Sequence, residues 1–350
     1  MPKSFDRIVI SETELAPFIC LPNQAGRAHA LLHQQQGAWE LLRNGYNSLQ
    51  RVRTRTFKFD GFQIKVQFNP GRITSTSAKV DPHSIRERKC FLCPDNLPPA
   101  QRGIACDGEY ILLCNPFPIF PEHFTISSTR HVPQRIISSF GTFLGFARDL
   151  GDLYTVFYNG PKCGASAPDH LHFQAGNRAF VPLDAEYEAI RKKQSATLIE
   201  TDSVRAYAVS GCLRHFIAVE SANPASLQWV FEELYAILQA NGAGDEEPML
   251  NILSFYQKGG WRVLFFPRAR HRPGFYFMEG DDQLLISPAA VELAGVCTTP
   301  REQDFEKVTR DHIVQMFEEV CVTQSDFCEL TGRLAERLAK LLAVKPIATE

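Results

Sequence analysis

The stretch Gly164-Ala-Ser-Ala-Pro-Asp-His-Leu-His-Phe-Gln-Ala175 is the most informative part of this sequence. In it, His170, His172 and Gln174 occupy every second position of a short run that reads as a β-strand. Side chains two residues apart on a strand lie on the same face, so these three polar groups are expected to converge. Alternating histidines are also typical of the solvated face of an antiparallel strand, so the pattern alone leaves a structural role open.

The loop before these residues adds a chemical reason to expect a binding site. Backbone N–H groups in a loop containing Gly164 and the hydroxyl of Ser166 are suited to binding a phosphate group. An imidazole with an unperturbed pKa of about 6.5 is largely neutral near pH 7 and can attack phosphorus. The stretch therefore indicates chemistry on a phosphate.

Length and composition place the chain among ordinary globular proteins. Its 350 residues suggest about two domains, and 37 Lys and Arg against 39 Asp and Glu leave a net charge of -2. No chain-wide basic field is present for nucleic acid, so nucleic acid is not expected as a partner. The polar start of the chain lacks the apolar run of a signal peptide, and no segment has the length of a membrane span. We therefore expect a cytoplasmic protein that does not associate with membranes.

Apolar periodicity and turn residues predict a mixture of strands and helices without regular alternation. This pattern favours an α+β fold with antiparallel sheets packed with helices. Asp60-Gly61 favours a hairpin turn, and the proline-rich stretch 115–121 favours a rigid loop. The expected helices are 26–52, 136–150 and 227–240, and the expected strands are 54–59, 62–68, 110–114, 123–126, 153–158, 171–175, 204–209, 215–219, 250–255 and 261–266. We place a boundary near residue 200, dividing the chain into 1–200 and 201–350 with a close interface.

The run His170-Leu-His-Phe-Gln-Ala175 resembles the branch of the histidine-triad superfamily whose motif is His-x-His-x-Gln. This branch contains galactose-1-phosphate uridylyltransferase, diadenosine tetraphosphate phosphorylase and the GDP-hexose phosphorylases, and the run is most similar to the last. The resemblance implies two histidine-triad-like domains, the first of which is catalytic. It also implies that His172 forms a covalent nucleotidyl intermediate, that Gln174 binds the transferred phosphate and that the backbone carbonyl of His170 orients the His172 ring.

A second resemblance concerns metal binding. Lys89-Cys-Phe-Leu-Cys-Pro-Asp-Asn96 is similar to a segment of the uridylyltransferases in which two cysteines and two histidines hold a metal. By position, the resemblance implies a zinc site made of Cys90, Cys93, His131 and His170. The alternative is a pair of reduced thiols, because the phosphorylase relatives do not all keep the metal. The other cysteines, scattered between Cys20 and Cys328, are expected to be reduced.

Two further stretches resemble nucleotide-binding segments of the superfamily. The proline-rich stretch from Asn115 to Ile126 is similar to the place where the nucleoside sits, which makes Asn115 and Phe117 candidates for base or ribose contact. The alternative for Phe117 is a place in the core, where most Phe side chains lie. Phe68-Asn-Pro-Gly-Arg72 is similar to an Asn-x-Gly-Arg segment of the phosphorylases. It makes Arg72 and Lys79 candidate phosphate ligands, with a solvated turn as the alternative for Arg72.

The second half is similar to the C-terminal domain of the diadenosine tetraphosphate phosphorylases around Leu250–Phe255 and Trp261–Arg268, but it contains no His-x-His-x-Gln. We expect a degenerate second histidine-triad-like domain that supports the substrate. Arg268 belongs to a basic cluster with Arg270, His271 and Arg272. This cluster could reach an acceptor phosphate, or it could be a solvated loop.

Together these features predict a nucleotidyltransferase or phosphorylase acting on a nucleotide sugar or dinucleoside polyphosphate, with phosphate or a sugar phosphate as acceptor. Alternatives are a hydrolase of the same superfamily, a non-catalytic nucleotide-binding protein and a zinc-stabilised interaction module. Three residues separate Ser166 from His170, one more than the uridylyltransferase pattern, which weighs against a strict UDP-hexose enzyme. A homodimer is expected only because sheet pairing across dimers is common in the superfamily.

Overall fold

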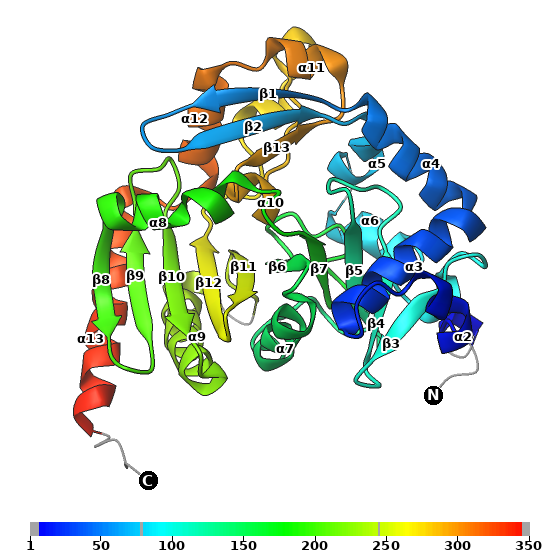
Figure 1. Ribbon diagram of the computed structural model, residues 1–350. Helices are drawn as coiled ribbons and strands as arrows, with labels where there is room; N and C mark the ends of the chain where they lie inside the picture. Colours follow the sequence, from blue (N-terminus) through cyan, green and yellow to red (C-terminus); the bar gives the residue numbers. More distant parts are fainter. Residues whose placement is uncertain (1–6, 78–79, 244–245, 345–350) are drawn as a thin grey trace.

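The structure, a computed structural model, describes residues 7–77, 80–243 and 246–344 (Figure 1). The α-helices are α2 (Glu12–Leu15), α3 (Gln24–Ala38), α4 (Glu40–Ser48), α5 (Ile73–Thr76), α6 (Pro82–Glu87), α7 (Phe140–Leu150), α8 (Pro182–Gln194), α9 (Pro224–Leu238), α10 (Ala290–Leu293), α11 (Glu302–Lys307), α12 (Arg310–Val320) and α13 (Gln324–Val344). The strands are β1 (Arg53–Lys58), β2 (Gln63–Phe68), β3 (Gly103–Cys106), β4 (Tyr110–Cys114), β5 (His123–Ser128), β6 (Tyr154–Asn159), β7 (His172–Asn177), β8 (Ser195–Glu200), β9 (Arg205–Val209), β10 (Phe216–Ser221), β11 (Leu250–Gln257), β12 (Gly260–Pro267) and β13 (Val296–Thr299).

A ten-stranded antiparallel sheet forms the centre of the described chain. Its order is β3-β4-β5-β7-β6-β11-β12-β10-β9-β8. The two halves have the same connectivity, because β3-β4-β5-β7-β6 corresponds strand by strand to β8-β9-β10-β12-β11. They meet where β6 pairs with β11 and Asn159 lies opposite Asn251. Helix α7 precedes β6, and α9 precedes β11 in the same way. The α+β fold with two histidine-triad-like halves is therefore confirmed.

The division at residue 200 stays a prediction. The strand just before it, β8, pairs with β9 of the second half, so this pairing continues across the predicted boundary.

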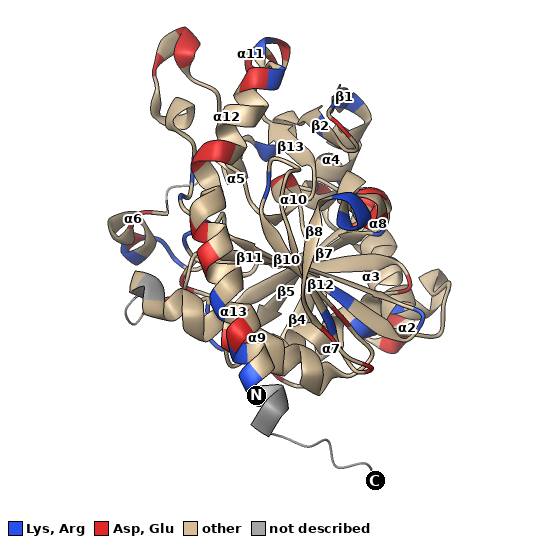
Figure 2. Cartoon of the chain, turned by 90° about the vertical axis from the view of Figure 1, so that its left-hand side faces the viewer, with Lys and Arg blue, Asp and Glu red and all other residues tan. Residues whose placement is uncertain are grey.

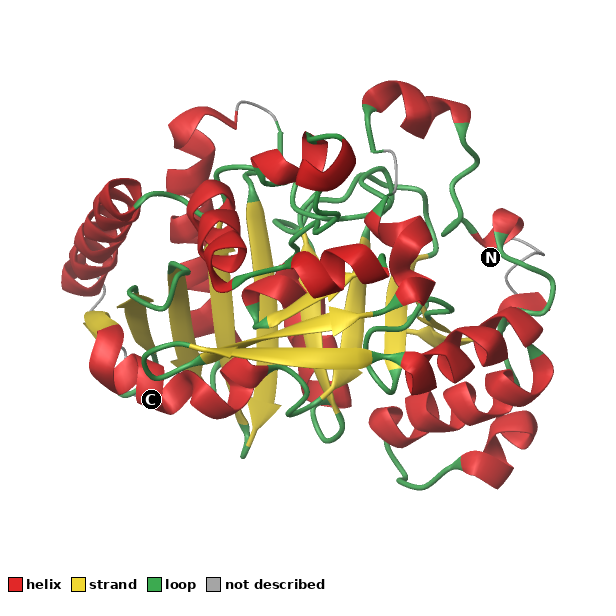
Figure 3. Cartoon of the chain, turned by 90° about the horizontal axis from the view of Figure 1, so that it is seen from above, coloured by secondary structure: helices red, strands yellow, loops and turns green. Residues whose placement is uncertain are grey.

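A second, three-stranded sheet joins the two halves on one side of the molecule. The hairpin β1–β2 turns at Asp60-Gly61 as predicted, with Gly61 at a φ of 81° that favours glycine. Strand β13 of the second half then pairs with β2 in parallel, an exception to the expected antiparallel pairing. Seen from above, this hairpin crosses the strands of the large sheet (Figure 3).

Each face of the large sheet has its own apolar core. Helices α3, α7, α9 and α13 cover one face, which buries Phe140, Phe173 and Phe231 among others. The other face packs against α8, α10 and the three-stranded sheet, with Phe157, Phe216 and Phe266 in its core. Burial of this many aromatic side chains is the main favourable contribution to folding.

Several predicted boundaries shift for local reasons. The helix expected over 26–52 is broken at Trp39, whose backbone is extended with φ of -122° and ψ of 107°. This break turns the Trp39 side chain into the interior, where only 5% of its surface stays exposed. Strand β7 begins at His172, so His170 lies in the turn before it. The helix predicted from 136 begins at Phe140, and β3, α8, β8 and β13 were not predicted.

Residues of both charges are interspersed on the side of the molecule that Figure 2 shows. Helix α13 carries both acidic and basic residues, and its Arg337 pairs with Glu233 of α9 at 3.2 Å. Among the described residues, no helix combines the length and apolar character that crossing a bilayer requires.

Candidate active site

A cavity of about 690 Å³ lies where the first half meets the second. Its apolar lining residues include Trp39, Leu41, Phe91, Leu97 and Phe117. Its polar lining residues include Arg72, Ser166, His172, Gln174, Arg272 and Glu292. A small number of polar groups beside an apolar wall is typical of a site for a ligand with an apolar end and a charged end.

His172 lies at the start of β7 with 5% of its surface exposed. Its Nδ1–H donates to the backbone carbonyl of His170 at 2.8 Å, the contact that the resemblance implied, so the lone pair stays on Nε2. The side chain of Gln134 holds the backbone of His172 on both sides, with N···O distances of 2.8 and 3.0 Å. Burial lowers the pKa of His172 to about 4, so the imidazole is neutral near pH 7. The ring is therefore neutral and in a fixed tautomer with Nε2 unprotonated, so it could act as a nucleophile.

Gln174 follows on the same face of β7 and also lines the cavity. Its Oε1 lies 2.9 Å from Nε2 of the buried His123 on β5. His170 does not join them there: it lies before the strand, and its ring is directed to two cysteines. His172 and Gln174 thus lie on one face of the strand as expected, whereas His170 contacts the His172 ring through its backbone carbonyl.

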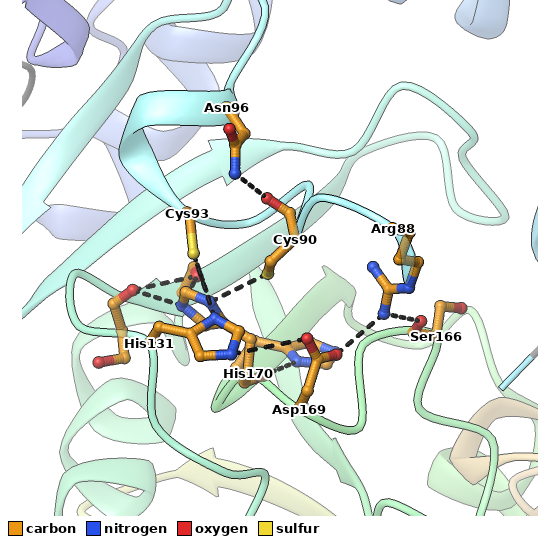
Figure 4. Close-up of polar contacts among 11 residues, drawn as sticks. Arg88, Cys90, Cys93, Asn96, His131, Ser166, Asp169 and His170 are labelled. Atoms are coloured by element: carbon orange, nitrogen blue, oxygen red, sulfur yellow. Dashed lines mark hydrogen bonds and ion pairs between the residues drawn. The ribbon is translucent and has the colours of Figure 1, made fainter. Parts of the chain in front are cut away.

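The loop 164–169 closes one side of the cavity. Gly164 has a φ of 94°, and a Cβ there would lie 2.5 Å from the Cβ of Ala289 in the second half. Glycine is therefore needed both for the backbone conformation and for the close approach of the two halves. Arg88 binds this loop through the Ser166 carbonyl at 3.3 Å and Asp169 at 2.9 Å (Figure 4). Gly164 and Ser166 both line the cavity.

Arg72, Asn115 and Phe117 form a connected group at the cavity. Arg72 Nη1 donates to the Phe117 carbonyl at 2.7 Å, and the Phe117 N–H donates to Asn115 Oδ1 at 2.9 Å. All three line the cavity. Burial lowers the pKa of Arg72 to about 10, which leaves it charged near pH 7. Lys79, the other predicted phosphate ligand, lies outside the described residues.

Arg268 is not placed as a phosphate ligand, which corrects the sequence-based expectation. It is 5% exposed, and its N–H groups donate to Asn251 Oδ1 and to the carbonyls of Pro288, Val320, Arg270 and His271. An arginine has five N–H donors, so these contacts leave none for a ligand. Asn251 in turn contacts Asn159, which accepts from the N–H of Ala290. Arg268 therefore holds the second half against the cavity.

Other residues of the second half border the cavity instead. Arg272 donates from Nε to Ser287 at 2.9 Å and lies over the Tyr276 ring at 4.2 Å. Glu292 caps α10 by accepting from the Ala289 N–H, and burial raises its pKa. The basic cluster at residues 268–272 correctly indicated that this segment borders the cavity. The sequence could not indicate which of its side chains enter the cavity, because side-chain direction in a loop follows no periodicity. Trp39, which falls within the helix expected over 26–52, is a further cavity residue, and the helical pattern around it did not indicate a site.

Four potential metal ligands lie together beside the loop 164–169: Cys90, Cys93, His131 and His170 (Figure 4). One potential ligand atom from each lies within 4.8 Å of all the others. Nδ1 of His170 is 3.3 Å from Cys90 Sγ and 3.6 Å from Cys93 Sγ, and Nδ1 of His131 is 3.2 Å from Cys93 Sγ. In a tetrahedral zinc site, sulfur and nitrogen ligands are about 3.5 Å apart. The cluster could therefore bind a metal ion.

The surroundings of His170 agree with this use. Its Nε2 lies 2.8 Å from the Ser128 carbonyl, which only accepts, so Nε2 carries the proton. Nδ1 is then left with its lone pair toward the two sulfurs. A ligating histidine that donates its other N–H to a carbonyl is the usual arrangement around a bound metal.

Comparison with known proteins gives related sequences over both halves. Residues 31–177 match DUF4922, a domain of unknown function, and residues 188–341 match the GDPGP1-like C-terminal domain. Diadenosine 5',5'''-P1,P4-tetraphosphate phosphorylase 2 of Saccharomyces cerevisiae is 31% identical over 125 residues, which are 32% of this chain and 38% of the relative. The chain thus matches little more than a third of that relative's length.

Solved structures extend the similarity of the fold to most of the chain. Yeast Ap4A phosphorylase Apa2 covers 81% of this chain and 96% of its own, with a TM-score of 0.53 and 16% identity. Its complex with Ap4A covers 83% and 96%, with a TM-score of 0.50 and 18% identity. The chain therefore shares the fold of these Ap4A phosphorylase structures, and its second half matches the GDPGP1-like C-terminal domain. Its first half carries the sequence His-x-His-x-Gln at residues 170–174, with His170 just before β7 and the other two side chains on it, and the equivalent strand β12 lacks this sequence.

Proposed function

We propose that this protein is a nucleotidyltransferase or nucleotide phosphorylase that works through a covalent nucleotide adduct on His172. The observation that carries the proposal is the fixed tautomer of His172 in the cavity, with Nδ1–H held by a carbonyl and the Nε2 lone pair left for attack. The similarity to Ap4A phosphorylases supports the same chemistry. Arg72 and the amide of Gln174 supply positive charge and a hydrogen-bond donor for phosphate oxygens.

The proposed reaction has two steps. In the first, Nε2 of His172 forms a bond to the α-phosphorus of the donor, and the P–O bond to the rest of the molecule breaks. The leaving group departs with the bonding electrons as a phosphorylated product. In the second, an oxygen of the acceptor phosphate or sugar phosphate attacks the same phosphorus, and the P–N bond breaks to restore the imidazole. Two in-line attacks retain the overall configuration at phosphorus.

The donor is proposed to be a dinucleoside polyphosphate or a nucleotide sugar. The apolar lining residues Trp39 and Phe117 suit a nucleobase, and the polar lining residues suit the phosphates and the second group. Phosphorolysis needs a bound anion as acceptor, and Arg272 is the cavity cation that the second half supplies.

A substrate screen tests this proposal. Ap4A, UDP-hexoses and GDP-hexoses are incubated with the protein, with and without phosphate, and products and intact protein mass are measured. We expect a mass gain of one nucleoside monophosphate without phosphate and turnover when phosphate is added. Turnover at a rate that does not depend on phosphate would instead indicate the hydrolase. Nucleotide binding without an adduct on the protein would indicate a non-catalytic nucleotide-binding protein. Metal binding without nucleotide binding would indicate an interaction module.

The contribution of the second half is tested by three arginine variants. We expect Arg272→Ala to slow phosphate-dependent breakdown of the adduct by about 10- to 100-fold, because a charge-assisted contact to the acceptor is lost. Formation of the adduct should change much less. Single-turnover measurements of both steps give the comparison, and equal losses in both would contradict an acceptor role.

The two neighbours are matched controls for this test. Arg270 is exposed, so Arg270→Ala should leave both steps unchanged. Arg268→Ala should lower the free energy of unfolding by about 2–4 kcal/mol, since it leaves buried acceptors without donors.

We further propose that Cys90, Cys93, His131 and His170 bind a metal ion and that this ion is zinc, because two thiolates and two imidazoles are the donors it prefers in tetrahedral sites. Its chemistry would be structural: it would tie the segment around Cys90 to the turn that carries His170. A cytoplasmic location, a homodimer and a division at residue 200 remain proposals from the sequence.

A further inference from the structure

His123 lies behind Gln174, on the strand next to the nucleophile. It is fully buried on β5, and its Nε2 is 2.9 Å from Gln174 Oε1. Its other ring nitrogen, Nδ1, is 3.3 Å from the backbone nitrogen of Ile119. Of the described residues, Gln174 borders the cavity and His123 does not. His123 is therefore placed to act on a ligand through the Gln174 side chain and not by direct contact.

The two contacts determine where the proton of His123 sits. A backbone N–H only donates, so Nδ1 must accept from Ile119 and carries no proton. The neutral ring then has its proton on Nε2 and donates it to Gln174 Oε1. Protonating Nδ1 as well would set it against the Ile119 N–H. Burial also lowers the pKa of His123, to about 3.

The position of the ring is itself fixed on several sides. The hydroxyl of Tyr46 contacts both the backbone N–H and the carbonyl of His123, at 3.0 and 3.2 Å. Phe120 packs edge-on against the imidazole, with ring centroids 5.2 Å apart. Gly176, opposite His123 in the sheet, leaves space for the Phe120 ring, because a Cβ at residue 176 would lie 2.4 Å from Phe120. The imidazole therefore has little freedom to turn.

A glutamine amide has two ends of nearly the same shape but of opposite hydrogen-bonding character. When the carbonyl end is held by a donor, the NH₂ end is directed the other way. In the cavity this distinction matters, because phosphate oxygens attract an NH₂ group and repel a carbonyl oxygen.

We propose that His123 is a positioning residue that fixes the Gln174 amide with its NH₂ group toward the transferred phosphate. The inference rests on the proposed function of the cavity. Loss of the Nε2–H donor would let the amide rotate by half a turn, so that its carbonyl faces the phosphate for part of the time. Binding of the phosphate and formation of the His172 adduct would both weaken.

Two substitutions of His123 separate this role from a structural one. In His123→Asn, the side-chain oxygen can still accept from the Ile119 N–H, but the donor to Gln174 is lost. In His123→Gln, the longer amide can place an N–H near the former position of Nε2. We expect His123→Asn to reduce the rate of adduct formation from Ap4A by about 10- to 100-fold, and His123→Gln to recover most of that loss.

A double-mutant cycle with Gln174→Ala supplies the decisive comparison. If His123 acts through Gln174, His123→Asn should change the rate less than about twofold once Gln174 is alanine. The same loss in both backgrounds would overturn the proposal, and so would equal loss in the Asn and Gln variants. The cycle is repeated for AMP affinity by calorimetry, which requires no turnover.

The tautomer is tested without any ligand. In ¹⁵N spectra of the wild-type protein labelled at histidine, His123 should show a protonated Nε2 and an unprotonated Nδ1. A proton on Nδ1 would overturn the proposal even if the enzyme is active. Conversely, wild-type protein that forms no adduct with any donor would count against the proposed function, while the spectra and the AMP cycle would still decide the role of His123.

Discussion

His172→Asn is expected to lose at least about 10³-fold in turnover and to form no nucleotide adduct. Asparagine keeps a polar side chain of similar length but has no basic ring nitrogen for attack on phosphorus. In the structure, Nε2 of His172 is the nitrogen left unprotonated by the bond to the His170 carbonyl, and no change of tautomer is needed before attack. Intact-protein mass after incubation with donor, together with steady-state rates, measures both effects.

Gln174→Ala is the matched comparison for this variant. It alters the next side chain on the same face of β7, yet it leaves the nucleophile in place. We expect it to slow adduct formation without abolishing the mass gain. Thermal unfolding checks that each variant folds. We expect no change, because Gln134 contacts only the backbone of residue 172 and should hold the strand as before. Undiminished turnover in His172→Asn would exclude the proposed mechanism.

The fold followed from the sequence wherever local patterns match the final structure. Alternating apolar residues and the Asp60-Gly61 turn predicted the first hairpin and most strands of both halves. The parallel pairing of β13 with β2 could not be predicted, because more than 200 residues separate residues 296–299 from the hairpin and no local pattern records such a distant contact. The break at Trp39 also depends on tertiary packing, which outweighs helix propensity there.

The site was less accessible to sequence reasoning than the fold. A short motif placed His172 and Gln174 on one face, since the geometry of a strand is regular. Arg268 and Arg272 lie in the same basic cluster, and no periodicity distinguishes a buried arginine from a cavity arginine in an irregular loop. His123 lies within the proline-rich stretch from Asn115 to Ile126, but its proposed role depends on its contact with Gln174 between strands β5 and β7.

Cys90→Ser is expected to cause the largest loss of stability. If a metal is bound in the wild-type protein, its binding free energy contributes to folding, and replacing a thiolate with a hydroxyl removes a strong ligand. The melting temperature should fall by on the order of ten degrees, and the metal content should drop from about one zinc per chain. Differential scanning calorimetry and metal analysis of protein purified without chelator give both numbers.

The consequence for activity is expected to be indirect. His170 lies in the turn that leads into β7, and its carbonyl orients the His172 ring, so a loosened metal cluster should disturb the nucleophile more than the nucleobase wall. We therefore expect Cys90→Ser to reduce adduct formation more than nucleotide affinity. Cys106→Ser is the control, since Cys106 is buried on β3 away from the cluster and contacts Gln24. Equal melting temperatures and equal metal contents in Cys90→Ser and Cys106→Ser would contradict the metal site. Cys90, Cys93, His131 and His170 would then be packing groups and not ligands.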